Sequence, residues 1–444
     1  MRELKGNVVS KVLPKEKRNG FVRDIKTNNV YMIKYINVEK GYAEGLEFIK
    51  LNDDFTEIEK VVIAEKGKYN RETERWELEK AVVNNIKGRT SENHEKYVSE
   101  EYNEPPENFV TLSIDPRLLT TKELKKEIIW TGLGVFVYFV VSFIDYRKYA
   151  KYYKFIYAVN ILMLAAVYIF GDEAKGAKRW IDLGVISVQP SEFAKLFLVL
   201  SFAEILIIDY GKNFRGLKDM FLSGMHILPI FLLVLNQPDL GTSLVLIFIY
   251  LVMIFVHGID WKAIFQVGIL GAASIPIAYF FLLKDYQRTR IQTFLNPEAD
   301  LMNSGWNVVQ SKIAIGSGGM FGKGFLQGTQ SKLRFLPESH TDFIGSVFLE
   351  ERGFAGGVLL LVLYLALIMN IIKIGDSSED RYGKLICYGI ASIFFFHVVI
   401  NVGMIMGVMP VTGLPLLFMS YGGSSFVFGF LMLGIVHSVK IHKF

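Results

Sequence analysis

Three residues that can take up or release protons stand close together in the polar, Gly-rich segment 306–353: Glu338, His340 and Asp342. Apolar residues resume directly after Asp342, so its carboxylate lies where a loop meets a predicted membrane helix. This is a costly place for a charge and therefore a functional hypothesis. Such a carboxylate can act as a general base toward a hydroxyl group. The structural alternative is that Thr341 or Asp342 caps the helix that follows.

Two neighbours of Asp342 could also take part in chemistry. His340 is a second candidate base, with a polar loop contact as the alternative. Glu338 can bind a divalent cation, with a solvated loop charge as the alternative. No His, Cys or Asp spacing in the chain defines a metal site. The single cysteine, Cys387, excludes an internal disulfide framework and any Cys-rich metal site.

The loop that leads to Asp342, residues 284–342, is rich in cations and glycines. Its cations are Lys284, Arg288, Arg290, Lys312, Lys323, Lys332 and Arg334. Guanidinium and ammonium groups bind phosphate oxygens strongly, which favours a phosphorylated lipid as ligand, whereas attraction to anionic headgroups is the alternative. Glycines at 316–328 can let backbone N–H groups cradle phosphate, or can simply make tight turns. GMFGKG at 319–324 lacks the Walker A spacing, which excludes an ATPase of that class.

Three further segments hold candidate residues. Segment 176–195 contains Arg179 and Trp180, and then Glu192 and Lys195, which are three apart and share a helix face. Their pairing is the structural interpretation, and a Lys195 that reaches a lipid phosphate is the functional one. Asp239 lies in a hairpin that Pro238 and Gly241 also explain as a tight turn. Segment 401–425 ends near Ser424, and its prolines and glycines predict a broken helix against protein or a watery cavity.

Long apolar runs must position these residues. Hydrophobic residues make up 51% of the 444-residue chain, and the net charge is +5. Nine runs are long enough, or nearly so, to cross a bilayer as helices. They lie near 127–144, 155–171, 193–209, 221–235, 241–257, 263–283, 343–372, 385–406 and 425–439. Basic residues in 145–154, 210–219 and the C-terminal tail indicate that these segments are cytoplasmic, which puts the candidate residues on the outer side.

The first part of the chain has a different periodicity. Residues 21–25, 30–36, 45–51, 59–65 and 75–83 alternate apolar and polar positions and predict antiparallel strands, whereas 89–107 is predicted as a polar loop. The fold class is thus a multi-pass α-helical membrane protein of about nine spans with a small N-terminal all-β domain. We predict domains at 1–122 and 123–444.

Residues 310–345, QSKIAIGSGGMFGKGFLQGTQSKLRFLPESHTDFIG, resemble the large outer loop of the SEDS family (RodA, FtsW, SpoVE), and the GTQSKLRFLPE part is closer to RodA. GAKRWIDLGVISVQPSEFAK at 176–195, NQPDLGTS at 236–243 and NVGMIMGVMPVTGLPLLFMSYGGSS at 401–425 agree in family order. Family members usually have ten spans, so the first is expected to be lacking here. More loosely, 63–83 and 105–124 resemble the periplasmic β-jelly-roll of the LptF/LptG lipopolysaccharide-transport permeases, so a periplasmic domain is expected.

The SEDS resemblance implies a peptidoglycan glycosyltransferase in the cytoplasmic membrane. It would polymerise lipid II on the outer face for cell elongation and rod shape, with Asp342, the Asp of the HTDF motif, as the catalytic base. Substrate contacts are predicted at Arg179, Trp180, Glu192, Lys195, Asp239, Lys312, Lys323, Lys332, Arg334, Glu338, His340 and Ser424. Arg179, Trp180 and Lys195 match positions that the family needs, although Trp180 could equally anchor the chain at the membrane interface.

The same resemblance implies partners: a class B penicillin-binding protein, the elongation machinery and the lipid bilayer, with no nucleic acid. Mg²⁺ or Mn²⁺ is expected only from the chemistry and the family. Two other functions stay open. A lipid-diphosphate flippase would need the cationic groove but no base. A fusion with a lipopolysaccharide-transport adaptor role would be centred on residues 1–122.

Overall fold

The computed structural model describes most of the chain, in two compact units, residues 1–121 and 122–444. The described residues are 16–24, 29–52, 58–71, 73–86, 88, 90–98, 101–106, 121–174, 177–182, 187–210, 216–277, 285–296, 304–332, 336 and 340–442.

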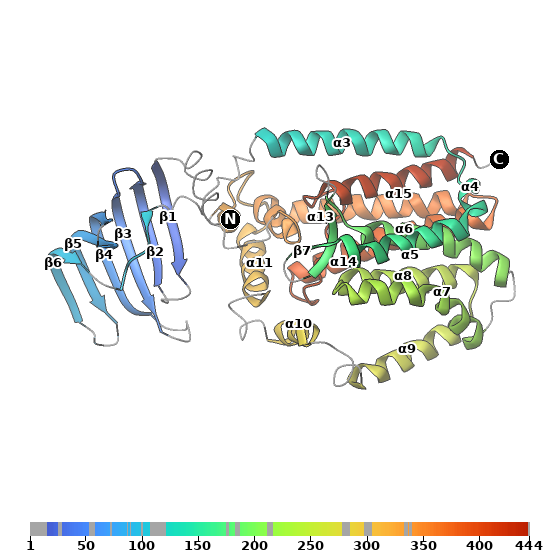
Figure 1. Ribbon diagram of the computed structural model, residues 1–444, viewed down its shortest axis with the longest axis horizontal. Helices are drawn as coiled ribbons and strands as arrows, with labels where there is room; N and C mark the ends of the chain where they lie inside the picture. Colours follow the sequence, from blue (N-terminus) through green and yellow to red (C-terminus); the bar gives the residue numbers. More distant parts are fainter. Residues whose placement is uncertain are drawn as a thin grey trace. The chain divides into compact units, whose positions relative to one another are not determined.

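The first unit is a six-stranded antiparallel sheet whose strands follow one another in sequence order (Figure 1). The strands are β1 (Glu16–Asp24), β2 (Asn29–Asn37), β3 (Tyr42–Leu51), β4 (Ile58–Asn70), β5 (Arg75–Asn85) and β6 (Thr90–Val98). The five predicted strands coincide with β1 to β5. The alternation of apolar and polar residues explains this agreement, because successive side chains in a strand point to opposite faces of the sheet and only one face is buried.

Aromatic side chains fill the buried face of the sheet. Tyr31 and Phe48 are directly opposite in β2 and β3, with ring centroids 5.1 Å apart, and Trp76 lies 6.0 Å from Phe48. The segment 101–106 is bound to the same face, since the Trp76 indole N–H donates to the Glu104 carbonyl at 2.8 Å. Glu101 forms ion pairs with Lys50 of β3 and Lys60 of β4 at 2.9 and 3.0 Å, which ties segment 101–106 to two strands of the sheet.

The prediction of a loop over 89–107 was wrong for Thr90–Val98, which forms the edge strand β6. This strand pairs with β5 through its backbone, while most of its side chains are exposed. A strand that buries neither face shows no apolar alternation, so its sequence, TSENHEKYV, carries no strand signal.

The second unit is helical, and a helix lies in each of the nine predicted apolar runs. These helices are α3 (Thr121–Ser142), α5 (Tyr153–Phe170), α6 (Pro190–Ile205), α7 (Leu217–Asn236), α8 (Leu240–His257), α9 (Trp261–Ile277), α13 (Ile344–Asp376), α14 (Arg381–Ile405) and α15 (Gly423–Ile441). Shorter elements connect them: α4 (Arg147–Lys151), β7 (Asp172–Ala174), β8 (Ala177–Asp182), β9 (Ser187–Val188), a π-helical turn η2 (Leu206–Tyr210), α10 (Asp285–Leu295), α11 (Ser304–Gly318) and α12 (Thr329–Lys332).

Within the described residues, six helices are both long and apolar enough to cross a bilayer: α5, α7, α8, α13, α14 and α15. The multi-pass helical class is confirmed, whereas the number nine stays a prediction. Helix α14 is central and packs against α6, α8, α13 and α15. Its side chains Ile386, Ile390 and Phe394 are completely buried, so α14 lies at the centre of the helical unit.

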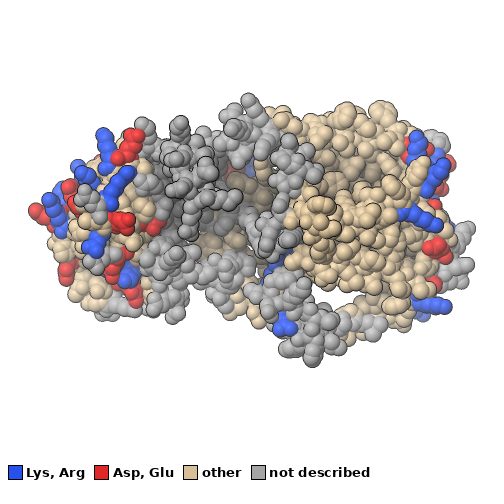
Figure 2. Space-filling view, viewed as in Figure 1, with Lys and Arg blue, Asp and Glu red and all other residues tan. Residues whose placement is uncertain are grey.

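The helical unit has two distinct ends. At one end, the turn after α3, the start of α14 and the end of α15 meet: Tyr146 donates its backbone N–H to Ser438 and its hydroxyl to Asp380. On the face seen in Figure 2, charged side chains gather at this end, and the visible described flank of the helical unit is largely uncharged. At the other end α6, α8, α13 and α15 begin (Figure 1). The segments predicted to be cytoplasmic and those that carry the candidate residues therefore lie at opposite ends.

Candidate active site

A cavity of about 400 Å³ lies at the end where α6, α8, α13 and α15 begin. It brings together the four segments singled out in the sequence. Its lining consists of Arg179, Trp180, Gln189, Glu192, Asp239, Thr242, Arg290, Thr341, Asp342, Val411, Thr412, Gly413, Leu414, Pro415, Tyr421, Gly422, Ser424 and Ser425. Six predicted residues therefore share one cavity: Arg179, Trp180, Glu192, Asp239, Asp342 and Ser424.

Asp342 is half-buried and lies in the turn before α13. The capping alternative is wrong, because the N-cap residue is Phe343 and not Thr341 or Asp342. Asn401 of α14 holds the turn in place by donating to the Asp342 carbonyl at 2.9 Å and to the Leu414 carbonyl at 2.8 Å. A Cβ on Gly413 would stand 3.6 Å from Asp342 Oδ2, so the carboxylate group lies against the 411–415 loop.

The loop after α14 also binds the backbone of 340–342 through hydrogen bonds. Tyr421 donates its N–H to the His340 carbonyl, and Ser420 donates its hydroxyl to the Thr341 carbonyl, both at 2.8 Å. His340 itself has an exposed side chain that does not line the cavity, so its role as a second base stays a prediction. Hydrogen bonds from α14 and from the loop after it therefore fix the backbone around the half-buried Asp342.

Asp239 anchors another part of the cavity wall. This residue caps α8 by accepting the Thr242 N–H at 3.2 Å, and its Oδ2 accepts from Ser191 at 2.9 Å and Gln189 at 3.1 Å. Arg179 on β8 donates to the carbonyls of Gln237 and Pro238, which braces the turn before Asp239. Asp239 therefore both belongs to the tight turn and lines the cavity.

Lys195 is placed differently from the prediction. Its side chain is 0% exposed and does not line the cavity. Its ammonium lies 2.8 Å from Glu192 Oε1 and 2.8 Å from His397 Nε2, so the structural interpretation, pairing with Glu192, is the one observed. The second carboxylate oxygen of Glu192 is buried and has no hydrogen-bond partner among the described residues.

His397 of α14 extends this chain of contacts. Because the Lys195 ammonium can only donate, His397 Nε2 must accept, and Nδ1–H then donates to the Pro415 carbonyl at 2.8 Å. The chain Glu192–Lys195–His397–Pro415 links two walls of the cavity. Sequence reasoning missed His397, which sits in an apolar run with no local signal of a polar partner.

Of the loop cations predicted as substrate contacts, Lys312 and Lys323 have described side chains, and neither is in the cavity lining. Lys323 bonds Glu350 at 2.7 Å, and Glu350 is completely buried and also accepts the Thr329 N–H at 2.7 Å. Lys312 on α11 has an exposed side chain outside the cavity lining. The side chain of Lys332, and Arg334 and Glu338 altogether, lie outside the described residues.

The glycines of this loop make tight turns, and three N–H groups of the loop are used in hydrogen bonds within the protein. The N–H groups of Gly322, Lys323 and Gly324 donate to the carbonyls of Gly318, Glu350 and Glu351. Gly353 interrupts α13 with φ of 67°, and a Cβ there would overlap the Gly322 nitrogen. The backbone of 318–324 thus packs directly on a break in α13, which requires glycine on both sides.

Arg290 is a cavity residue that the sequence did not distinguish from the other loop cations. It lies on α10, one turn before Phe294, and lines the cavity that contains Asp342. Of the cations in 284–342 with described side chains, Arg290 is the one in the cavity lining. A possible signal was its i, i+4 spacing to an apolar residue that can anchor a short helix.

Comparison with known proteins extends these observations. The family model of the cell cycle proteins FtsW, RodA and SpoVE matches residues 117–444. The chain belongs to the FtsW/RodA/SpoVE family. A second model, of the lipopolysaccharide export system permeases LptF and LptG, matches residues 1–171.

Relatives and solved structures of the FtsW/RodA/SpoVE family agree. The peptidoglycan glycosyltransferase MrdB of Escherichia coli K12 is 41% identical over 320 residues, which cover 72% of this chain and 86% of MrdB. The peptidoglycan glycosyltransferase RodA of Treponema pallidum is 36% identical, covering 73% and 90%. A structure of a peptidoglycan synthase complex that coordinates polymerization and crosslinking matches with a TM-score of 0.64 at 34% identity, covering 73% and 91%. The rod shape determining protein RodA of Thermus thermophilus matches with a TM-score of 0.55 at 32% identity, covering 74% and 89%.

Proposed function

We propose that the chain is a peptidoglycan glycosyltransferase that polymerises lipid II into glycan strands for cell elongation. The observation that carries this proposal is Asp342, a half-buried carboxylate in a cavity that also contains Arg179 and Arg290. Family membership and the peptidoglycan glycosyltransferase activity of MrdB and RodA support the same reaction.

In the proposed reaction a sugar hydroxyl attacks the anomeric carbon of a sugar linked to a lipid diphosphate. The new C–O bond forms as the bond to the diphosphate breaks, and the hydroxyl proton passes to the Asp342 carboxylate. Undecaprenyl diphosphate leaves with the bonding electrons, and its developing charge is stabilised by guanidinium groups. A carboxylate held by backbone contacts on two sides is suited to this task because it needs little reorganisation.

A requirement for Mg²⁺ or Mn²⁺ stays a prediction. No three His, Cys, Asp or Glu side chains within the described parts of the chain gather to hold an ion. In the cavity, Asp239 already accepts hydrogen bonds from Ser191 and Gln189, and Glu192 is paired with Lys195. These residues do not fit a resident metal cage. An ion shared between substrate phosphates and one carboxylate would fit, as is usual for Mg²⁺.

Polymerisation of purified lipid II tests this proposal. Asp342→Asn keeps the shape of the side chain but removes the base, and we expect glycan synthesis to fall by at least about 100-fold. Asp376→Asn, at the far end of α13, is the matched control and should stay near the native rate. Full activity of Asp342→Asn would overturn the assignment. A native chain that moves lipid II across vesicles and makes no glycan would favour the flippase.

We also propose that the cavity opens at the outer face of the cytoplasmic membrane. The distribution of basic residues between the two ends of the helical unit supports this orientation. The one native cysteine, Cys387, is buried, so introduced cysteines can be labelled selectively. An impermeant maleimide added to intact cells should label His340→Cys and not Lys148→Cys; the reverse pattern would invert the orientation.

Two further proposals concern partners and the first unit. The matched synthase complex coordinates polymerization with crosslinking, so we propose a class B penicillin-binding protein of the elongation machinery as partner here. For residues 1–122 the LptF/LptG match supports a β-rich unit outside the membrane, ahead of a transferase unit at 123–444. Complementation of a rod-shape-defective strain with and without residues 1–122 separates a transferase role from an adaptor role.

A further inference from the structure

Two polar side chains of α14, His397 and Asn401, are completely buried and face the loop 406–422 that follows this helix. They are four residues apart in the chain, so they lie on the same face of α14. Residues 410–416 of the loop form neither helix nor strand. Carbonyl groups that are buried in such a segment need hydrogen-bond donors from elsewhere, and α14 supplies them.

Asn401 joins Asp342 to this loop through one side-chain amide. Its Nδ2 donates to the Asp342 carbonyl at 2.9 Å and to the Leu414 carbonyl at 2.8 Å. Carbonyl oxygens only accept, so both protons of the amide are used and its orientation is fixed. A Cβ on Gly413, the residue before Leu414, would stand 3.6 Å from Asp342 Oδ2. The amide therefore sets how closely the loop approaches the carboxylate.

His397 holds the next carbonyl group of the loop. Its Nε2 accepts from the Lys195 ammonium, and its Nδ1–H donates to the Pro415 carbonyl, both at 2.8 Å. Lys195 is itself held by Glu192 at 2.8 Å. The buried ion pair thus decides which ring nitrogen of His397 carries the proton. As a result, two consecutive carbonyl groups of the loop are bound by one face of α14.

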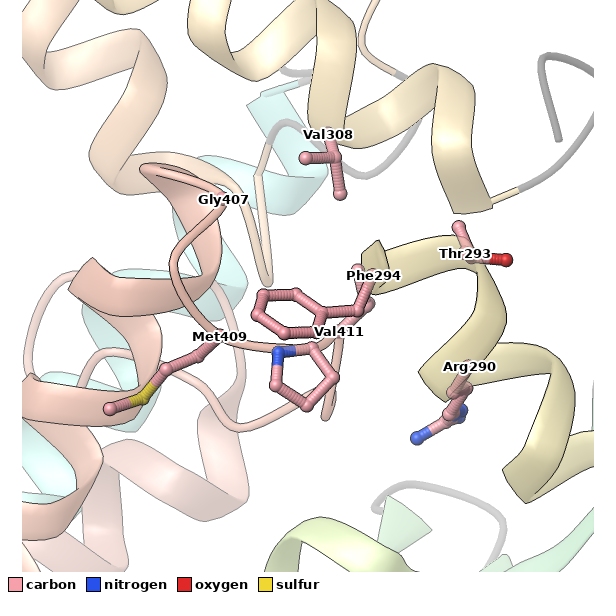
Figure 3. A pocket seen from close by; sticks show the side chains of 8 residues that line it. Arg290, Thr293, Phe294, Val308, Gly407, Met409 and Val411 are labelled. Atoms are coloured by element: carbon pink, nitrogen blue, oxygen red, sulfur yellow. The ribbon is translucent and has the colours of Figure 1, made fainter. Parts of the chain in front are cut away.

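The start of the loop is held by packing against α10 and α11. The turn 407–411 lines a void of only about 10 Å³ together with Phe294 of α10 and Val308 of α11. Figure 3 shows Phe294 directed toward this turn. A void of this size barely accommodates one water molecule, so the surfaces are in close contact. Loss of the bonds from α14 would therefore displace the middle of the loop while its start stays packed.

We propose that Asn401 and His397 are positioning residues for the transfer reaction, and that they hold the loop so that the Asp342 carboxylate stays aligned with the attacking hydroxyl. The inference rests on the proposed transferase function and refines the site of its base. Neither side chain lines the cavity. Their loss should therefore change the rate of the chemical step and leave substrate binding near its native strength.

The test uses the full chain in detergent, with lipid II as substrate. Asn401→Leu removes the donor, and we expect kcat to fall by about 10- to 100-fold with KM within about twofold of native, since a shift of a catalytic group by about 1 Å has an effect of this size. His397→Leu should act in the same direction. His397→Gln should keep most of the native kcat, because its amide can accept from Lys195 and donate to Pro415. Ser392→Ala, which removes another buried hydrogen bond of α14, is the matched control.

Backbone amide hydrogen exchange gives a second measurement that does not depend on activity. Tyr421 donates its N–H to the His340 carbonyl at 2.8 Å, so exchange of this amide reports whether the loop is seated on the turn before α13. Exchange across 411–421 should be about 10-fold faster in both leucine variants than in the native chain, as for loss of one hydrogen bond. The control variant should exchange at the native rate.

The outcomes separate this inference from the proposed function. Native kcat or native exchange in Asn401→Leu, with Asp342→Asn inactive, would overturn the positioning role and leave the transferase intact. Faster exchange in Asn401→Leu, in a chain that makes no glycan, would keep the attachment of the loop to α14 and overturn the transferase. A raised KM with native kcat would indicate a substrate contact and refute positioning. Unfolding midpoints are compared for all variants. If Asn401→Leu is unfolded, His397 decides: equal losses in His397→Leu and His397→Gln would refute the hydrogen-bonded role.

Discussion

Replacing Lys195 by Met removes one charge from a pair inside the helical unit. Lys195 Nζ lies 2.8 Å from Glu192 Oε1, and the two side chains are 0% and 4% exposed. Two unit charges at this distance attract by about 6 kcal/mol at an effective dielectric constant of about 20. Desolvation offsets much of this attraction, but loss of one partner leaves an uncompensated buried carboxylate. We therefore expect Lys195→Met to lower the free energy of unfolding by about 3–5 kcal/mol.

A double-mutant cycle in detergent, followed by thermal or denaturant unfolding, measures this effect. Glu192→Gln together with Lys195→Met leaves no buried charge and should recover most of the loss, which a simple packing defect would not do. Lys384→Met is the matched control, because its ion pair with Asp376 is 3.2 Å long and about half-exposed and should contribute at most about 1 kcal/mol. Equal stability of Lys195→Met and Lys384→Met would refute the account of a buried pair.

Two further predictions concern stability. Hydrogen bonds from Lys50 and Lys60 lower the pKa of Glu101, so its carboxylate stabilises the sheet above the ordinary glutamate pKa of about 4.3, and this contribution is lost as pH falls through the lowered value. The rate of backbone amide hydrogen exchange across 29–104, corrected for its intrinsic pH dependence, should therefore rise more on acidification in the native chain than in Glu101→Gln. Equal pH dependence of the exchange rate in the two proteins would contradict this. Gly353→Ala should lower stability by about 1–3 kcal/mol, because φ is 67° and the added Cβ meets Gly322. Gly268→Ala on α9, with nothing nearby, is the control, and equal unfolding midpoints would argue against a strained Gly353.

Local patterns in the sequence were sufficient to predict β1 to β5, the nine long helices and the candidate residue Asp342. Alternation and long apolar runs predicted β1 to β5 and helices in nine places, because burial of one face or of a whole helix leaves a regular trace in the chain. An acid at the start of an apolar run needed no partner to be noticed, since a charge there is costly by itself. The edge strand β6 left no such trace because it buries neither face.

Only the tertiary structure decided which charged residues share the cavity with Asp342. Lys195, Lys323 and Arg290 are all cations near family motifs, and composition treats them alike. Lys195 is buried outside the cavity lining and contacts His397, and Lys323 pairs with the buried Glu350. Arg290 lines the cavity because α10 packs near the turn after α14. These contacts join residues that are far apart in the chain, and no local periodicity encodes them. The sequence by itself determined β1 to β5, the nine long helices and the position of the acid, and the packing of helices selected the residues around it.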